Sequence, residues 1–220
     1  MVSGALTGLI LAGGQGRRMQ GADSAPMHAS AMDQFDPQAN GLGVEKGLLM
    51  LDGLPLVAHA QRFLAPHTQH ILISANRHQK AYAQYGEVVS DDSALEENSG
   101  PLAGIASVLS CCATDWLVVL PVDVPRPPAD LVKRLAGAVG EDGPRIAYAR
   151  SAERAHPLCM VVHRSLKPSL YQFLQMGERK VRMWQARYGA VPVLFDVSDD
   201  AAFFNINTPA DLLRASRNPL

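Results

Sequence analysis

Two short stretches of the chain carry residue types that bind phosphate and metal. Residues 11–19 read Leu-Ala-Gly-Gly-Gln-Gly-Arg-Arg-Met and follow the apolar run 6–10. Glycines let the backbone approach a ligand closely, successive backbone N–H groups form an anion-binding concavity, and arginine binds phosphate bidentately. Residues 120–125, Leu-Pro-Val-Asp-Val-Pro, place the Asp123 carboxylate after another apolar run, where a divalent metal is commonly held. Together the two stretches indicate a nucleoside triphosphate site.

The elements that must position these residues alternate along the chain. Strands are predicted at residues 6–11, 71–74, 88–89, 116–120, 146–149, 158–162 and 191–195. Helices are predicted at 54–64, 100–112, 129–139, 166–176 and 179–188, and a last helix begins at Pro209 with Thr208 as its N-cap. This alternation is typical of βαβ units in a mostly parallel sheet with helices on both faces. Because ligands bind outside the carboxyl ends of such strands, we expect the glycine loop and Asp123 to converge.

Composition narrows the class of protein. The 220 residues are 47% hydrophobic and 19% charged, which predicts one α/β domain over residues 1–220. A net charge of −1 argues against a nucleic-acid partner. The three cysteines form neither a disulfide framework nor a zinc set, so a cytoplasmic, reducing setting is the simplest. No apolar run reaches the ~18 residues of a membrane span, and the apolar N-terminus reads as a core strand, not as a signal peptide.

The stretch 20–44 does not fit the alternation. It is rich in Ala, Gly, Ser, Asp, Pro and Met, and it lacks periodicity. A loop of roughly 25 structureless residues inside a domain is either flexible or functional. We interpret it as a flexible insertion, with a lid over the site or a partner contact as the alternative.

Nine motifs together resemble one known family. They are LAGGQGRRM (11–19), EKGLLMLDGLPL (45–56), SANRHQ (74–79), DDS (91–93), GPLAGI (100–105), PVDVP (121–125), ERAHPL (153–158), GERKVRMW (177–184) and FFNINTPADL (203–212). Across nearly its whole length the sequence resembles the molybdenum cofactor guanylyltransferases. These are nucleotidyltransferases, so the resemblance implies a Rossmann-like, three-layer α/β/α fold of the glycosyltransferase-A type.

The resemblance also implies a reaction and its participants. The family transfers GMP from GTP to the terminal phosphate of molybdenum-molybdopterin and releases pyrophosphate, with Mg²⁺ bound. The N-terminal half then binds GTP and the C-terminal half binds molybdopterin. Implied protein partners are the molybdenum insertion enzyme and molybdoenzyme chaperones, met transiently by a monomer. Positioning and charge neutralisation carry such a transfer.

Several residues match positions at which the family binds the nucleotide or catalyses the reaction. The phosphate-binding loop and its arginines correspond to Leu11, Ala12, Gly13, Gly14, Gly16, Arg17 and Arg18. Lys46 matches a nucleotide-binding lysine, although Glu45 stands where relatives commonly carry aspartate. Asp123 is the expected Mg²⁺ ligand, and we expect Arg18, Lys46 and Asp123 to be the catalytic residues. The alternative for Asp123 is a turn-initiating role before proline.

Further nucleotide contacts are expected from the middle of the chain. Asp92 aligns with a carboxylate that contacts GTP, and Asp91 is its alternative. Ser74 stands where some relatives carry a guanine-contacting asparagine, and serine cannot make the same two-point contact; Asn76 is a nearby substitute. Gly104 belongs to a helix start that faces the nucleotide or serves close packing.

The acceptor side is expected at the C-terminal half. The residues matching acceptor-binding positions are Arg179, Lys180, Arg182, Asn205 and Asn207. A solvated helix face is an equal interpretation of the basic cluster. His156 lies in a segment that the family places near the acceptor, and a structural turn histidine is the alternative.

Three other functions compete with guanylyl transfer. A molybdopterin cytidylyltransferase typically carries LAAG in place of Leu11-Ala12-Gly13-Gly14. A sugar-1-phosphate nucleotidyltransferase is generally longer. A non-catalytic GTP- or cofactor-binding module would not require Lys46 and Asp123.

Overall fold

The protein is described by a computed structural model over residues 4–13, 45–96, 99–196 and 202–217. The strands are β1 (Leu6–Leu11), β2 (Met50–Leu51), β3 (Leu54–Pro55), β4 (His70–Ser74), β5 (Glu87–Val89), β6 (Trp116–Pro121), β7 (Ile146–Arg150), β8 (Ala155–His163) and β9 (Val191–Leu194). The helices are α1 (Leu56–Leu64), α2 (Gln79–Tyr82), α3 (Pro101–Cys111), α4 (Leu131–Gly137), α5 (Lys167–Gln175), α6 (Val181–Arg187) and α7 (Pro209–Arg217). Short 3₁₀ helices span Lys46–Leu48, Ala65–His67 and Arg164–Leu166.

Seven strands form one sheet in the order β5-β4-β1-β6-β8-β7-β9, and β2 pairs with β3 in a separate hairpin. Strand β1 lies inside the sheet and pairs in parallel with β4 and β6, so that Leu11 lies opposite both Ser74 and Pro121. Strand β8 is antiparallel to its neighbours β6 and β7. The carboxyl ends of β1, β4 and β6 therefore meet at one edge of the sheet.

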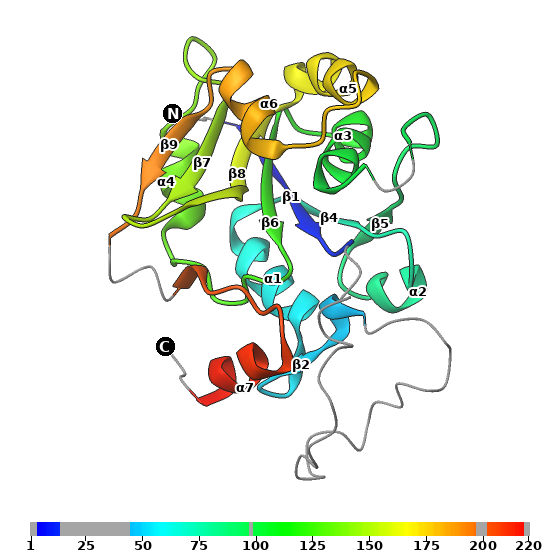
Figure 1. Cartoon of the computed structure of the whole chain (residues 1–220), viewed down its shortest axis with the longest axis vertical. Coiled ribbons are helices and arrows are strands. Elements are labelled where there is room, and N and C mark those ends of the chain that lie inside the picture. The colour runs from blue at the N-terminus through cyan, green and yellow to red at the C-terminus, as the bar shows by residue number, and fades with distance from the viewer. Residues whose placement is uncertain (1–3, 14–44, 97–98, 197–201, 218–220) are drawn as a thin grey trace.

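Two apolar layers cover the two faces of this sheet (Figure 1). One contains α1 and α4 with Phe195, Phe203 and Ile206 from the C-terminal part of the chain. The other contains α3, α5 and α6, with Trp184 fully buried. Helix α3 has a nearly continuous buried surface because it packs between the sheet and α5. The result is the three-layer α/β/α arrangement that the alternation of elements predicts.

Helix α3 approaches the sheet closely at one glycine. A Cβ atom at Gly104 would lie 3.0 Å from the Ser74 Cβ and closer still to the Ser74 Oγ. Both residues are buried, Ser74 with 6% of its surface exposed. Gly104 thus lets α3 rest directly on the end of β4.

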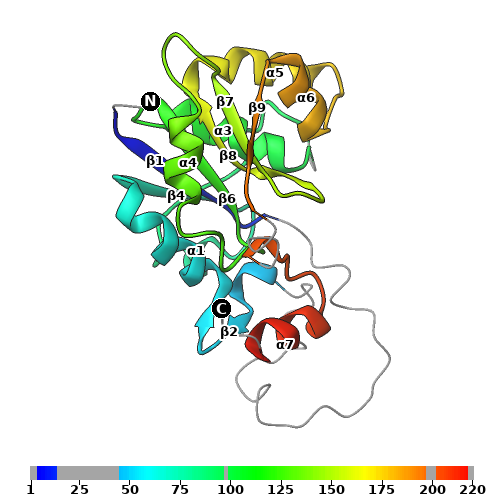
Figure 2. The same ribbon diagram turned by 90° about the vertical axis from the view of Figure 1, so that its left-hand side faces the viewer.

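The last helix begins where its sequence predicts. The Asp211 N–H donates to the Thr208 Oγ at 3.1 Å, and Pro209 is the first residue of α7. Asp211 in turn accepts from the Thr208 N–H at 2.8 Å, which makes a reciprocal N-terminal cap. Figure 2 shows α7 beside β2, below the sheet.

The mostly parallel sheet and its strands are confirmed, and the differences from expectation are local. The strand expected at 158–162 begins earlier, at Ala155, and the helix expected at 129–139 is shorter, Leu131–Gly137. The helix expected from residue 54 begins at Leu56, because residues 54 and 55 pair with β2. The four-residue helix α2 has no periodic pattern long enough to predict it.

Among the described residues, no helix combines the length and the apolar character that crossing a membrane requires.

We expect Gly104→Ala to lower the free energy of unfolding by about 1–3 kcal/mol, because the added methyl group overpacks α3 against β4. Urea unfolding with comparison of midpoints and slopes measures this change. Gly137→Ala is the matched control, since a Cβ at Gly137 meets no atom within 4 Å and alanine favours a helix. Equal midpoints for the two variants would contradict the close-packing role of Gly104.

Candidate active site

A cavity of about 1070 Å³ opens at the edge where β1 and β6 end. Its described lining comes from chain segments far apart in sequence. They are Leu11–Gly13, Lys46, Pro101, 121–124, 154–159, 203–205, Asn207, Asp211 and Arg214. The convergence of the glycine loop with Asp123, expected from sequence, is confirmed for the described part of that loop, Leu11 to Gly13.

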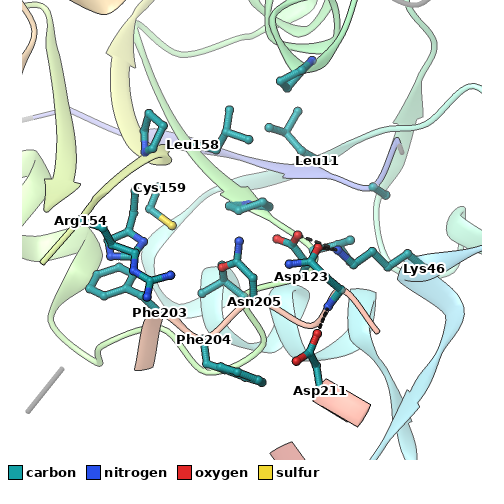
Figure 3. Close-up of a pocket in the computed structure, with 18 of the residues that line it drawn as sticks. Leu11, Lys46, Asp123, Arg154, Leu158, Cys159, Phe203, Phe204, Asn205 and Asp211 are labelled. Atoms are coloured by element: carbon teal, nitrogen blue, oxygen red, sulfur yellow. Dashed lines mark hydrogen bonds and ion pairs between the residues drawn. The ribbon is translucent and has the colours of Figure 1, made fainter. Parts of the chain in front are cut away.

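Lys46 and Asp123 form an ion pair in this cavity (Figure 3). The Lys46 Nζ donates to the Asp123 Oδ2 at 2.8 Å and to the Asn207 Oδ1 at 2.7 Å. The side chains of Lys46 and Asp123 are 15% and 20% exposed, so solvent screens this pair less than a surface pair. An ammonium group carries three donors, and the described residues accept two of them, so the third can meet an anionic ligand.

Backbone hydrogen bonds fix the strand ends around this pair. The N–H groups of Ala12 and Gly13 both donate to the Ser74 carbonyl, at 3.1 and 3.0 Å. The Val122 N–H donates to the Leu11 carbonyl, and the Ile206 N–H donates to the Asp123 carbonyl at 2.9 Å. The hydrogen bond from Ile206 holds the Asn205–Asn207 segment beside Asp123, the candidate metal ligand.

The Asp211 carboxylate stabilises the Asn205–Asn207 segment through backbone hydrogen bonds. Its Oδ2 accepts from the N–H groups of Asn207, at 3.0 Å, and of Thr208. Burial acts to raise the pKa of Asp211, but these hydrogen bonds and the nearby Lys46 charge outweigh it, so the pKa lies below its ordinary value of 3.8. Asp211 is therefore ionised at neutral pH and holds Asn207 where it meets Lys46.

The far wall of the cavity is aromatic and cationic. The His156 ring stacks on Phe203 with centroids 4.1 Å apart and planes 11° apart. The Arg214 guanidinium lies 5.1 Å from the centre of the Phe204 ring, and Arg154 also lines this wall. Flat rings and positive charge suit a ligand with a heteroaromatic ring and a phosphate.

Sequence reasoning did not single out several of these lining residues. They are Arg154, Phe203, Phe204, Asp211 and Arg214. All five lie within or just after the motifs ERAHPL and FFNINTPADL, so the motifs marked the segments but not the side chains. Cys159 also lines the cavity, although it is 1% exposed.

Ser74 and Gly104 are placed together as a packing contact. Neither is among the described residues that line the cavity. The Ser74 carbonyl, and not its side chain, is the group shown here to bind the glycine loop. Their expected nucleotide contacts stay predictions.

Asp91 and Asp92 make separate hydrogen bonds near the end of β5. Asp92 accepts from the Tyr171 hydroxyl at 2.7 Å and from the Ala94 N–H at 2.9 Å. The bond from Ala94, with that from Tyr171 next, lowers the pKa of Asp92. Asp91 exchanges two hydrogen bonds with Asn76, each 2.8 Å long. Which carboxylate meets a nucleotide stays a prediction, as it was from sequence.

The basic cluster at α6 lies apart from the cavity lining. Lys180 precedes α6 and is exposed. The Arg179 guanidinium donates to the Glu96 carboxylate at 2.7 Å, so part of the cluster is a surface ion pair. The acceptor-binding role of Lys180 stays a prediction, whereas Asn205 and Asn207 line the cavity.

The other sequence-based site candidates lie outside the described residues. They are Gly14, Gly16, Arg17, Arg18 and the insertion 20–44.

The donor set of the cavity fits Mg²⁺ shared with a substrate. Mg²⁺ is usually held by one or two carboxylates together with substrate phosphates and water. Asp123 supplies one carboxylate at the cavity wall. In the part of the chain that the structure describes, no group of three His, Cys, Asp or Glu residues forms a complete metal cage. The ion would therefore need phosphate oxygens to complete its coordination.

Comparisons with known proteins agree with this arrangement. Residues 8–191 match the model of the MobA-like NTP transferase domain. A molybdenum cofactor guanylyltransferase from Ralstonia nicotianae is 39% identical over 216 residues, which are 94% of each chain. The crystal structure of molybdopterin-guanine dinucleotide biosynthesis protein A from Archaeoglobus fulgidus has a TM-score of 0.68 at 22% identity, covering 96% of this chain and 97% of that one. A Mycobacterium tuberculosis protein in complex with manganese has a TM-score of 0.64 at 12% identity, covering 98% and 100%.

The sheet order, the strand-end cavity and the matched domain define a nucleotidyltransferase. Within that class, the chain belongs to the molybdenum cofactor guanylyltransferase family.

Because the folded pKa of Asp211 is lowered, the stability it contributes is present above the ordinary value of 3.8 and is lost as the pH falls through the lower folded value. We therefore expect Asp211→Asn to unfold more easily than the parent at pH 6–7 and to lose that difference toward acid pH. Urea midpoints measured from pH 7 downward test this. Asp142→Asn, at an exposed turn, is the control, and a pH-independent difference for Asp211→Asn would contradict the account.

Proposed function

We propose that this protein transfers the GMP group of GTP to the terminal phosphate of molybdenum-molybdopterin and releases pyrophosphate. The product is the guanine dinucleotide form of the molybdenum cofactor. The observation that carries the proposal is a single cavity in which the Leu11–Gly13 turn, the Lys46–Asp123 pair and the Asn205–Asn207 segment meet. It supports the proposal because family membership supplies the reaction and the cavity supplies room for two substrates.

The two substrates approach the ion pair from opposite sides. We place GTP on the side of Gly13 and Pro101, where the glycine loop begins and where Pro101, the first residue of α3, lines the cavity. We place the acceptor on the side of Arg154, His156 and Asn205, where aromatic and cationic side chains suit a pterin bearing a phosphate. Figure 3 shows Arg154 on one side of Asp123 and Lys46 on the other, with Leu11 above the Lys46–Asp123 pair.

The chemical step is an in-line phosphoryl transfer. An oxygen of the acceptor phosphate attacks the α-phosphorus of GTP, a new P–O–P linkage forms, and the bond to the pyrophosphate oxygen breaks. Positioning and stabilisation of the developing negative charge supply most of the catalysis. Lys46 places a positive charge between the two substrates, and the hydrogen bond to Asn207 holds the Lys46 ammonium group in position.

Asp123 is the residue that would hold Mg²⁺ in this reaction. A bound Mg²⁺ would neutralise phosphate charge and orient the triphosphate. Lys46 must exchange part of its contact with Asp123 for contact with phosphate when the metal and nucleotide enter. The pairing seen here keeps the Asp123 charge compensated before they do.

The remaining family-derived roles are part of the same proposal. Arg17 and Arg18 bind the triphosphate or the acceptor phosphate, Asp92 contacts the nucleoside, and Lys180 contacts the acceptor. The glycines that shape the loop are Gly14 and Gly16. Two alternative functions would give different products in a transfer assay. A cytidylyltransferase would transfer CMP in place of GMP, and a non-catalytic module would bind GTP without transfer.

With Mg²⁺ and molybdenum-molybdopterin present, we expect release of pyrophosphate and formation of the guanine dinucleotide from GTP. We expect CTP to be used at least about a hundredfold less efficiently, because a base read by hydrogen bonds is rejected when its partner groups are missing. Product mass and pyrophosphate release measure both. Equal or preferred use of CTP would identify a cytidylyltransferase, and GTP binding without pyrophosphate release would identify the non-catalytic module.

We expect Asp123→Asn to lower kcat for GMP transfer about 100- to 1000-fold, the loss typical of removing one group that stabilises the transition state. The variant keeps the size of the side chain, so we expect the fold to be retained. Turnover at saturating Mg²⁺ and urea unfolding measure the two effects separately. Asp142→Asn is the control, and wild-type turnover in Asp123→Asn would remove Asp123 from the mechanism.

A further inference from the structure

The residue before Lys46 points into the protein. Glu45 is 4% exposed, and its Oε1 accepts a hydrogen bond from the Tyr82 hydroxyl at 2.8 Å. Tyr82, the last residue of α2, is completely buried. Neighbouring side chains thus point in different directions: the Glu45 side chain points into the protein interior, and the Lys46 side chain points into the cavity.

The residue after Lys46 touches the same tyrosine. A Cβ atom at Gly47 would lie 3.0 Å from the Tyr82 Cε1 and closer still to the Tyr82 hydroxyl. The Tyr82 ring therefore occupies the space in which a larger residue 47 would place its side chain. Tyr82 meets the turn at two points, the Glu45 carboxylate and the Gly47 backbone.

Two further side chains, those of Arg77 and His78, lie near the Glu45 carboxylate. The Arg77 Nη2 lies 3.5 Å, and the His78 Nε2 lies 3.9 Å, from the Glu45 Oε2. Burial nevertheless raises the pKa of Glu45, opposed by Tyr82, Arg77 and His78. A buried carboxylate is costly for folding unless its partners are well placed, and a packing role alone would be served by an apolar residue.

Two backbone hydrogen bonds close the short turn that contains Lys46. The Leu48 N–H donates to the Glu45 carbonyl at 3.1 Å, and the Leu49 N–H donates to the Lys46 carbonyl at 3.2 Å. Lysine has a long, flexible side chain that loses conformational entropy when it is fixed. A backbone anchored on both sides of Lys46 limits the positions from which its ammonium group can reach Asp123 and Asn207.

We propose that Tyr82 is a positioning residue for the transfer reaction: through Glu45 and Gly47 it holds the Lys46–Leu48 turn so that the Lys46 ammonium group reaches the reacting phosphate. The inference rests on the proposed role of Lys46 in that reaction. Tyr82 itself touches neither substrate. Its effect on turnover passes through Lys46.

The test is a double-mutant cycle on GMP transfer. We expect Tyr82→Phe to lower kcat/KM for GTP about tenfold to a hundredfold, because a displacement of about 1 Å at a reacting group costs up to that much. In a Lys46→Ala background, we expect Tyr82→Phe to cause no further loss, since two residues that act as a unit are not additive. Tyr85→Phe, which removes a hydroxyl just beyond α2, is the control and leaves kcat/KM unchanged.

Rates are compared per folded molecule, with the folded fraction measured by circular dichroism. Glu45→Ala removes the acceptor in place of the donor and gives the same pattern by a second route if Tyr82→Phe folds poorly. Equal losses in the parent and Lys46→Ala backgrounds, or lowered stability with unchanged kcat/KM, would overturn the positioning role. Wild-type turnover in Lys46→Ala alone would instead refute the proposed role of Lys46.

Discussion

The whole site depends on the pairing of β1 with a parallel strand on each side. This pairing sets Leu11 opposite Ser74 and Pro121, so three strands end at the same level. The backbone then continues from the ends of β1 and β6 into the cavity, and the glycine turn and Asp123 become neighbours despite their separation in sequence. A shift of register by one residue in either pair would turn the side chains of that strand to the other face and separate them.

Within this frame, the Lys46–Asp123 pair joins parts of the molecule that no single element connects. Lys46 follows a segment outside the described residues, Asp123 follows β6, and Asn207 precedes α7. The side chains of Lys46 and Asp123 are 15% and 20% exposed, and their pairing balances the two charges in the cavity. It keeps a carboxylate and an ammonium group compensated in a cavity that a polyanionic substrate would enter, and the substrate then replaces part of that compensation.

The sequence predicted the parts of the structure that follow from local pattern. Apolar runs located β1, β4, β6 and β9, and Thr208 with Pro209 located the start of α7. Long-range contacts left no comparable pattern. In the sequence, Glu45 was only a glutamate at a position where relatives commonly carry aspartate, and no nearby residue pattern identified Tyr82 as its partner. Gly104 could be a helix start near the nucleotide or a packing position, and only the closeness of Ser74 shows the packing contact.

The direction of β8 explains why the aromatic and cationic wall of the cavity was harder to predict than the Leu11–Gly13 turn. Hydrophobic periodicity identifies a strand but not its direction, and β8 runs antiparallel to β6. Its first residues, and not its last, therefore lie at the carboxyl end of β6, which brings Arg154 and His156 into the cavity with Asp123. One side of the site is built from the ends of parallel strands and the other from the beginning of a reversed strand. The reversal therefore brings the His156 ring and the Arg154 guanidinium to the same sheet edge as the Leu11–Gly13 turn and Asp123.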